Sequence, residues 1–297
     1  MKRFLLIIVL LFSSLIMVTA QEEEQEKKWE RMKPMATLFP RTIVKEKEPI
    51  EYMPTNEDNI TRSKIVWRII DCREKMNFPL YYPTILLDSR KSLVQTLYEG
   101  IQSGAVQAYD DEEFITLLTP TEVLGRFDAS DRMVTREKID GNGDTTYLIK
   151  GEIHWEEVRE FIVKERWYFD RHYSQLFVRI IGICPTRVYN KELNLSSDDD
   201  YAVTGQELKR KLFWVYFPEA RRVLGNSLTY IENNDMAQIS FDDLLHKRRF
   251  QSYIIAESNP LNDRKITDYT RDGIRAIMES ERIKREIMNW ESDLWEY

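Results

Sequence analysis

The sequence predicts a single compact α+β domain, with a strand-rich middle flanked by helices, an extended arm before it and an amphipathic helix after it. Residues 160–182 alternate apolar and polar side chains with the period of β-strands. Helical spacing with capping residues recurs on both sides of this region. No internal repeat and no second linker divide the chain, so we assign residues 59–297 to one domain.

Residues 1–20 have the composition of a secretory signal peptide. Lys2 and Arg3 precede an apolar run that begins at Phe4, and small or branched residues end the segment at Ala20. The next residue is Gln21 and not cysteine, so we expect no lipid at the new N-terminus. The segment predicts an exported, soluble protein without direct membrane insertion, so any membrane association is expected to come through a partner.

Charge and cysteine content restrict the partners further. The chain has 50 acidic and 43 basic residues, and loss of Lys2 and Arg3 would move its formal charge from −7 to about −9. An acidic surface is unsuited to phosphate contacts, so nucleic acid is excluded as a partner. Cys72 and Cys184 are the only cysteines, and a bridge between them would close a loop of 111 residues, positions 73 to 183. We favour two separately buried thiols and keep the disulfide as the alternative.

Residues 21–58 form the predicted arm. This stretch has four of the ten prolines, no glycine and dense mixed charge, so it buries too little apolar surface to fold alone. It still carries Trp29, Leu38 and Phe39. Two interpretations stay open: a flexible tether, or an arm that becomes ordered by wrapping a neighbouring molecule. In the second case these three side chains are candidate partner contacts.

Three segments before the middle of the chain are expected to be helical. Residues 59–77 have helical spacing, although the β-branched core at 65–70 makes that assignment ambiguous. Residues 88–104 are a clearer helix, with Gly104 placed to end it. A capping box that begins at Thr119 opens a short helix through Phe127.

The middle is expected to form strands. A turn at 140–144 predicts a hairpin between strands 133–139 and 145–149. The alternation at 160–169 continues after a turn into residues 176–182. Residues 211–217 are bulky on both faces, which is typical of a strand buried inside a sheet.

The last third is expected to return to helix. Ser240 is placed to cap a helix that runs to Glu257. A final helix is expected from about Thr270 to the end of the chain. Its apolar stripe consists of Ile283, Ile287, Trp290 and Leu294, continued upstream by Ile274, Ile277 and Met278.

Aromatic side chains crowd the end of this final helix. Trp290, Trp295 and Tyr297 are interleaved with acidic residues. We favour a helix that docks on its own domain, because undocked chain ends fray. The alternative is that some of these rings anchor a neighbouring subunit, which makes them candidate partner-binding residues.

The sequence shows one incomplete calcium-loop pattern. Asp140, Asn142 and Asp144 match its first ligands, but Thr145 stands where glycine is needed and Gly151 where glutamate is needed. A hairpin turn explains these residues without a metal.

Other catalytic signatures are incomplete or missing. His154 and Glu156 resemble the start of a zinc-deaminase signature that lacks its paired cysteines. The chain has no phosphate loop and no nucleophile elbow. We therefore predict no enzymatic activity, no metal and no cofactor.

Five long stretches carry a family resemblance. They are WRIIDCREKMNFPLYYP (67–83), WYFDRHYSQLFVRIIGICP (167–185), LFWVYFPEAR (212–221), FDDLLHKRRFQSYIIAESN (241–259) and ESERIKREIMNWESDLWEY (279–297). Together they resemble the GldN/PorN family, the gliding-motility proteins of Bacteroidota that are components of the type IX secretion system. The likeness spans nearly the whole chain after the signal and arm, in order.

The resemblance implies a periplasmic structural protein without enzymatic activity or cofactor. Family members associate with an outer-membrane lipoprotein of the GldK/PorK type and with copies of themselves in a large periplasmic ring. They also contact the periplasmic part of a motor protein of the GldM/PorM type. The resemblance does not assign individual binding residues.

Two other function classes remain as alternatives. A periplasmic hydrolase with an unrecognised acidic site would need a deep pocket with converging carboxylates of displaced pKa. A ligand-binding module would use exposed aromatics such as Tyr81 and Tyr82 as a stacking platform, although a packed turn explains these two residues more simply.

Overall fold

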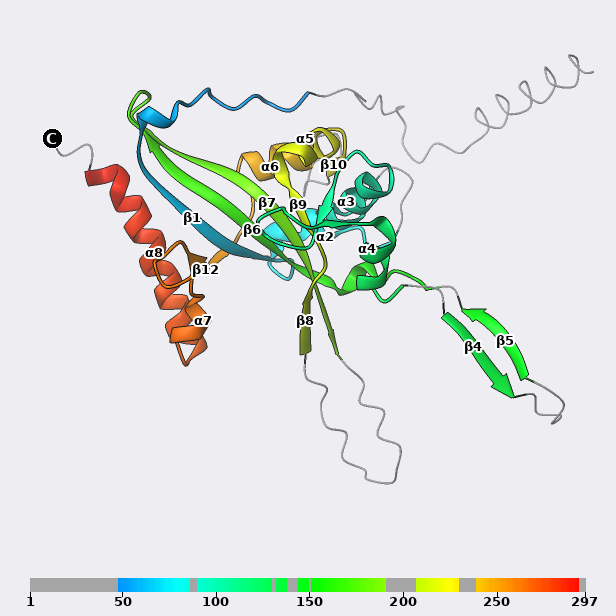
Figure 1. Ribbon diagram of the computed structural model, residues 1–297. Helices are drawn as coiled ribbons and strands as arrows, with labels where there is room; N and C mark the ends of the chain where they lie inside the picture. The colour runs from blue at the N-terminus through cyan, green and yellow to red at the C-terminus, as the bar shows by residue number, and fades with distance from the viewer. Residues whose placement is uncertain are drawn as a thin grey trace, which may run out of the picture. The chain divides into compact units, whose positions relative to one another are not determined.

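Two long antiparallel strands organise the fold. Strand β6 (Val158–Asp170) and strand β7 (Gln175–Asn190) are joined by a tight turn and pair along nearly their whole length (Figure 1). The computed structural model describes residues 48–85, 90–129, 132–137, 144–149, 151–190, 207–229 and 239–293. All of these belong to one compact unit, which confirms the predicted α+β class.

The other strands extend this pair into one antiparallel sheet. Its order is β12 (Tyr253–Glu257), β1 (Ile60–Asp71), β6, β7, β9 (Trp214–Tyr216), β2 (Ala108–Tyr109) and β3 (Leu117–Leu118), with β8 (Glu207–Lys211) also paired to β7. Two small separate ladders pair β10 (Leu228–Thr229) with β11 (Ile239–Ser240), and β4 (Arg132–Glu137) with β5 (Asp144–Ile149).

Short helices connect the strands, and one long helix follows them. The α-helices are α2 (Phe78–Tyr81), α3 (Leu93–Gln102), α4 (Pro120–Arg126), α5 (Phe217–Gly225), α6 (Phe241–His246), α7 (Ile266–Tyr269) and α8 (Gly273–Asp293). Single 3₁₀ turns are η1 (Glu57–Asn59), η2 (Lys75–Asn77) and η3 (Trp155–Glu157).

Capping boxes begin three of these helices. The side chains of Ser92, Thr119 and Ser240 each accept a hydrogen bond from a backbone N–H in the first turn of α3, α4 and α6. After α3 the chain turns at Gly104, whose φ of +72° is one that glycine adopts without strain. The helix predicted at 119–127 is thus confirmed, and the helix predicted at 88–104 is confirmed over 93–102, with a later start than expected.

Helices cover one face of the sheet, and the other face is covered mainly by loops. Ile70 and Phe161 are paired across β1 and β6 and both lie in the main apolar cluster, which packs under helices α2 to α6. A smaller cluster on the same side packs under α8. The opposite face carries a third cluster built around Trp67 and Ile162. We call this second side the open face, because loops cover it instead of helices.

Residues 59–77 are not a helix, so that prediction was wrong. They contain strand β1, which pairs with β6 on one side and β12 on the other. The β-branched run from Ile65 to Ile70 suits a strand in the interior of a sheet. Long-range pairing has therefore overridden the local helical spacing.

The helix predicted from Ser240 to Glu257 is correct at its start and wrong at its end. Helix α6 ends at His246, and Arg248 then takes a positive φ of 53° that helical backbone does not allow. The chain next enters the edge strand β12. Residues 211–217 are also only partly a strand: β9 covers 214–216, and α5 begins at Phe217, with a proline in its first turn.

The predicted hairpin between 133–139 and 145–149 is confirmed by the pairing of β4 with β5. Its turn at 138–143, including Asp140 and Asn142, lies outside the described residues.

The two cysteines are separate free thiols, and no disulfide joins them. Cys72 belongs to the cluster under the helices and Cys184 to the cluster on the open face. Both are buried, at 3 % and 0 % exposure. Because the sheet lies between them, the bridge kept as an alternative is incompatible with this fold.

The end of the predicted arm lies on the domain. Residues 48–56 run as extended chain along its surface before η1 and are hydrogen bonded to it. The compact domain therefore includes residues before position 59. The arm residues Trp29, Leu38 and Phe39 lie outside the described part of the chain.

Candidate functional site

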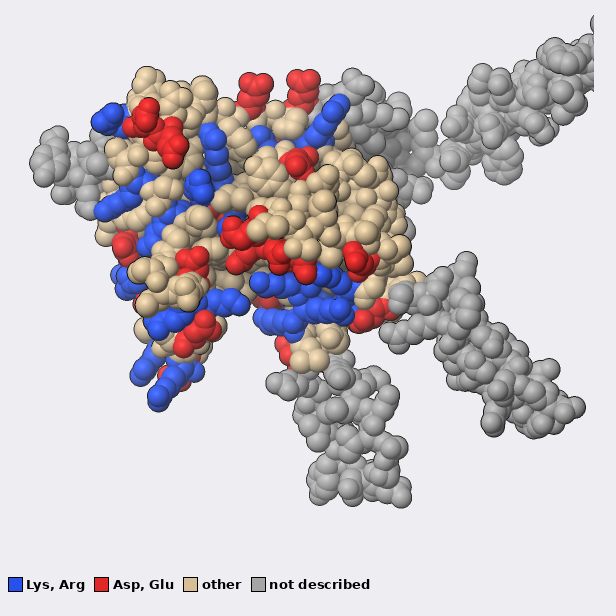
Figure 2. Space-filling model, viewed as in Figure 1, with Lys and Arg blue, Asp and Glu red and all other residues tan. Residues whose placement is uncertain are grey.

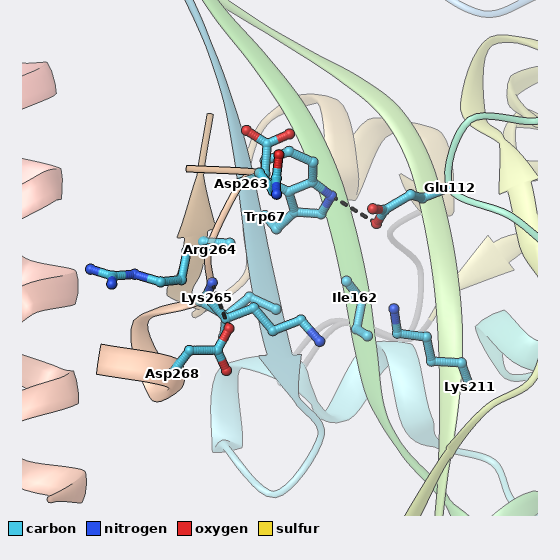
Figure 3. Close-up of a pocket in the computed structure, with 11 residues that line it drawn as sticks. Trp67, Glu112, Ile162, Lys211, Asp263, Arg264, Lys265 and Asp268 are labelled. Atoms are coloured by element: carbon cyan, nitrogen blue, oxygen red, sulfur yellow. Dashed lines mark hydrogen bonds between the residues drawn. The ribbon is translucent and has the colours of Figure 1, made fainter. Parts of the chain in front are cut away.

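A groove lies on the open face of the sheet and is lined by described residues. Trp67 from β1 and Ile162 from β6 form its floor, and Glu112 and Lys211 stand on one side (Figure 3). The segment after β12 forms the other wall. The cavity has a volume of about 270 Å³. The lining residues are Trp67, Glu112, Ile162, Lys211, Ile255, Ala256, Asn262, Asp263, Arg264, Lys265 and Asp268.

The floor and one wall are locked together through Trp67. Its indole Nε1–H donates a hydrogen bond of 3.1 Å to Glu112 Oε2. Lys164, which is paired with Trp67 across β1 and β6, donates to the Glu112 carbonyl at 3.1 Å and to Glu113 Oε1 at 2.8 Å. The Lys164 ammonium also lies 5.6 Å from the Trp67 ring, within cation–π range. These contacts hold the 110–116 loop on the sheet.

The same loop needs a glycine beneath it. A Cβ on Gly182 of β7 would lie 2.5 Å from Cζ of Phe114, so the absence of a side chain lets the ring rest on the strand. Phe114 itself has a positive φ of 58°. The ring also packs edge-on against Tyr109 and Trp214. This packing fixes the position of the wall that carries Glu112.

The opposite wall is organised by side chains that bond to its own backbone. Asn259 Oδ1 accepts the N–H groups of Leu261 at 3.0 Å and Arg264 at 3.3 Å. Asp263 Oδ1 accepts the N–H of Asn259 at 2.9 Å, and Asp268 Oδ2 accepts the N–H of Lys265 at 3.2 Å. These bonds stabilise a turn in which Asp263 takes a positive φ of 51°.

The charges of the groove are balanced and already engaged. Three carboxylates line it together with three cations, and each carboxylate accepts a hydrogen bond from the chain itself. Among the described residues no group of three or more His, Cys, Asp or Glu is arranged to hold a metal. The groove therefore has a lining of mixed charge whose carboxylates are oriented by the chain itself.

Basic side chains gather next to acidic ones where β8 leaves the sheet (Figure 2). Strand β8 supplies Lys209, Arg210 and Lys211 in succession. Lys209 is bonded to the buried Glu160 at 2.5 Å, and Arg210 lies 3.3 Å from Asp128. The region therefore presents paired charges and not a uniform basic surface.

Helix α8 has two different apolar faces. Its inner face buries Ile283 and Ile287, at 0 % and 2 % exposure, against β1 and β12. The upstream residues predicted to continue this stripe instead point outward. Together with Met288, which also points outward, they form what we call the outer stripe: Ile274, Ile277, Met278 and Met288, with exposures of 70 %, 64 %, 65 % and 59 %. Ile283 and Ile287 thus confirm the predicted stripe, its upstream continuation was wrong, and Leu294 lies outside the described residues.

Trp290 packs on its own domain. It is 8 % exposed and belongs to the cluster under α8. Its ring lies 4.6 Å from the Arg62 guanidinium and 5.8 Å from the Lys64 ammonium, both on β1. The favoured interpretation of a docked helix holds for this residue, which leaves it little surface for a partner. Trp295 and Tyr297 lie outside the described residues.

A buried ion pair separates the two apolar clusters on the helix-covered face. Glu165 of β6 is fully buried and lies between them along the strand. Arg248 donates two hydrogen bonds to its carboxylate, at 2.9 Å and 3.2 Å, and Trp167 Nε1 donates a third at 3.0 Å. Burial lowers the pKa of the neighbouring Arg68, although Glu165 opposes that shift. The Glu165 carboxylate thus accepts three hydrogen bonds, all from side chains of the fold.

Comparison with known families adds the identity. The family model described as "Gliding motility associated protein GldN" matches residues 55–296. The chain belongs to the GldN family. The match covers the sheet, the groove and α8, which confirms the resemblance seen in the sequence. Comparison with curated proteins gave no significant match. In the described part of this GldN-family chain, no helix is both long and apolar enough to cross a bilayer.

Sequence reasoning missed the groove of the GldN-family chain. Trp67 fell in a segment predicted to be helical, and 259–268 received no assignment. The signals that were present are local: Asn259 followed by Pro260 is typical of a turn, and the β-branched run before Trp67 is typical of a strand. Neither signal places the two segments beside each other.

Proposed function

We propose that this protein is a non-enzymatic structural subunit of the periplasmic ring of the type IX secretion system. In this role it bridges an outer-membrane lipoprotein of the GldK/PorK type and the periplasmic part of a motor protein of the GldM/PorM type. It thereby supports protein secretion and gliding motility. The family match over residues 55–296 carries the proposal, because it covers almost the whole folded domain.

Two features of the surface support a role in assembly. The outer stripe of α8 exposes four large apolar side chains on one helix, and exposed apolar surface of this kind is characteristic of protein contacts. The groove has a mixed lining whose polar groups are held in place by the chain itself. Export follows from the predicted signal at 1–20, so the outer membrane is reached through the lipoprotein.

The test is co-expression of the mature chain with its lipoprotein partner, followed by electron microscopy of the purified material. Closed rings that contain both chains are the expected result. A monomer that never captures the lipoprotein would contradict the proposal and would direct attention to the groove as a ligand site.

A matched pair of variants tests the contribution of the outer stripe. Ile277→Asp introduces a charge into the stripe, and Asn289→Asp introduces the same charge at another exposed position of α8. We expect fewer rings with the first variant and normal rings with the second. If both variants form rings equally well, the outer stripe does not contribute to ring assembly.

A further inference from the structure

A short extended segment is clamped onto the domain before the first strand. We call residues 48–56 the strap. It leads into β1 through the single turn η1, and within the described residues it pairs with no strand of the sheet. The strap is therefore held by side chains of the domain and not by a β-ladder.

We call the domain residues that hold the strap the clamp: Tyr173, Arg179 and Arg221. They contact mainly the main chain of the strap. Arg221 of α5 donates from Nη2 to the carbonyl of Ile50 at 2.6 Å. Arg179 of β7 donates from Nη2 to the carbonyl of Met53 at 2.5 Å. The hydroxyl of Tyr173 donates to the carbonyl of Pro54 at 3.2 Å. Contacts to carbonyl groups favour an extended peptide with little regard to its side chains.

One side chain of the strap enters the clamp. The Tyr52 ring lies 4.2 Å from the Arg221 guanidinium and 4.9 Å from that of Arg179, with the His246 ring at 5.7 Å. Both guanidinium distances are within cation–π range. Burial raises the pKa of Tyr52, which keeps the phenol neutral in this setting. The clamp is thus a site for an aromatic residue within an extended segment.

One arginine of the clamp is held in place by the domain itself. Arg221 forms a two-point ion pair with Asp242 of α6, with N–O distances of 2.9 Å and 3.2 Å. Both side chains are nearly fully buried. The guanidinium is therefore fixed in direction by the fold, and the site is pre-organised for a ligand.

The strap is held by polar and cation–π contacts more than by apolar burial. Its apolar side chains Ile50 and Met53 are 51 % and 54 % exposed, so the strap buries little apolar area. Segments with few buried apolar contacts open at low free-energy cost. Pro49 and Pro54 favour extended backbone, which limits the entropy lost when the strap docks.

We propose that this clamp is a binding site for an extended peptide, and that in the assembled protein it takes residues 48–56 of a second copy of the chain. Every copy carries both the clamp and the segment that fits it, so exchange needs no new contact. The turn η1 is the hinge about which the strap swings from its own domain to a neighbour. The inference rests on the proposed function for the assembly in which exchange occurs.

Two full-length mature variants test the exchange without the lipoprotein. Tyr52→Ala removes the ring from the strap and leaves the clamp intact. Arg179→Ala removes two hydrogen bonds and one cation–π contact to the strap, together with a cation–π contact to Tyr168, and leaves the strap intact. In the wild-type chain the tethered strap competes at an effective concentration on the order of millimolar, which hides exchange in dilute solution. Mixing the variants removes that competition.

We expect each variant alone to be a monomer by native mass spectrometry and the equimolar mixture to form heterodimers. A labelled peptide of residues 48–57 should bind the Tyr52→Ala chain about tenfold or more tightly than the wild-type chain, because the clamp of the latter is already occupied. The same peptide with alanine in place of its tyrosine should not bind. Far-UV circular dichroism checks that both variants remain folded.

A folded Tyr52→Ala chain that binds no peptide, or a mixture that stays monomeric, would overturn the inference. Rings that form with the lipoprotein in either case would leave the proposed function standing. Conversely, a peptide that binds as expected with a chain that never assembles would refute the proposed function and retain the clamp as a peptide site.

Discussion

Helix α8 is expected to stabilise the fold through its inner face alone, and Ile283→Ala is the sharpest test. Ile283 is fully buried against β1 and β12, so its truncation leaves a cavity. Such Ile→Ala changes cost about 2–5 kcal/mol. The cluster under α8 is small and lies near the sheet edge, where neighbours relax, so we expect a loss of about 3 kcal/mol in the free energy of unfolding. For a domain of this size that corresponds to a fall in Tm of about 6–12 °C.

Ile277→Ala is the matched control. It makes the same substitution on the same helix at a side chain that is 64 % exposed, so the change in helix propensity is shared and only burial differs. We expect its effect on the free energy of unfolding to stay within about 0.5 kcal/mol. Urea unfolding followed by far-UV circular dichroism measures both. Equal stabilities for the two variants would refute the assignment of an inner and an outer face.

Three further predictions concern the interior. Arg248→Met should lower the free energy of unfolding by about 3–5 kcal/mol, because it leaves the fully buried Glu165 without its guanidinium; adding Glu165→Leu should recover most of the loss, and no recovery would contradict the ion-pair argument. Burial raises the pKa of the Cys72 thiol and raises that of Cys184 to about 12, so both should resist alkylation at pH 8 until urea unfolds the chain. Fast alkylation of the native protein at pH 8 would disprove this burial. Because the folded state raises both thiol pKa values, the contribution of the two thiols to the free energy of unfolding is fully present below the ordinary thiol pKa of 9.0 and is lost as pH rises toward about 12. Urea titrations at pH 8 and pH 10 should show this decline. Gly182→Ala should cost about 1–3 kcal/mol, since the new Cβ meets an aromatic ring, and an unchanged urea midpoint would show that the ring moves freely.

Local signals in the sequence predicted the elements whose energy is local. The capping box at Thr119 and the cap at Ser240 each mark the true start of a helix, because the bonds that cap a helix lie within four residues. The end of α6 was not predicted, because it has no such local signal. Nothing in the sequence near Arg248 predicts the positive φ at which the helix has ended, and the side chain of Arg248 binds Glu165, a residue 83 positions away.

The groove could not be predicted, because it depends on register. Trp67 faces the open side only because β1 pairs with β6 in one particular register, and a shift of one residue would turn it under the helices. Glu112 reaches Trp67 because the ring of Phe114 rests on Gly182, a contact between residues 68 positions apart. The strap was missed likewise, since its proline-rich composition indicates only that it does not fold alone.

One face of α8 is buried against the sheet and the other is exposed to solvent. The inner face and Trp290 hold the helix on the sheet, so those residues set stability. The outer stripe lies on the opposite side of the same helix and contributes little to the fold, because it stays exposed. If the outer stripe mediates assembly as proposed, stability and assembly are separable on one helix. A truncation of α8 would remove both at once, whereas single substitutions on either face change one property and leave the other, which makes point variants the decisive tools for this protein.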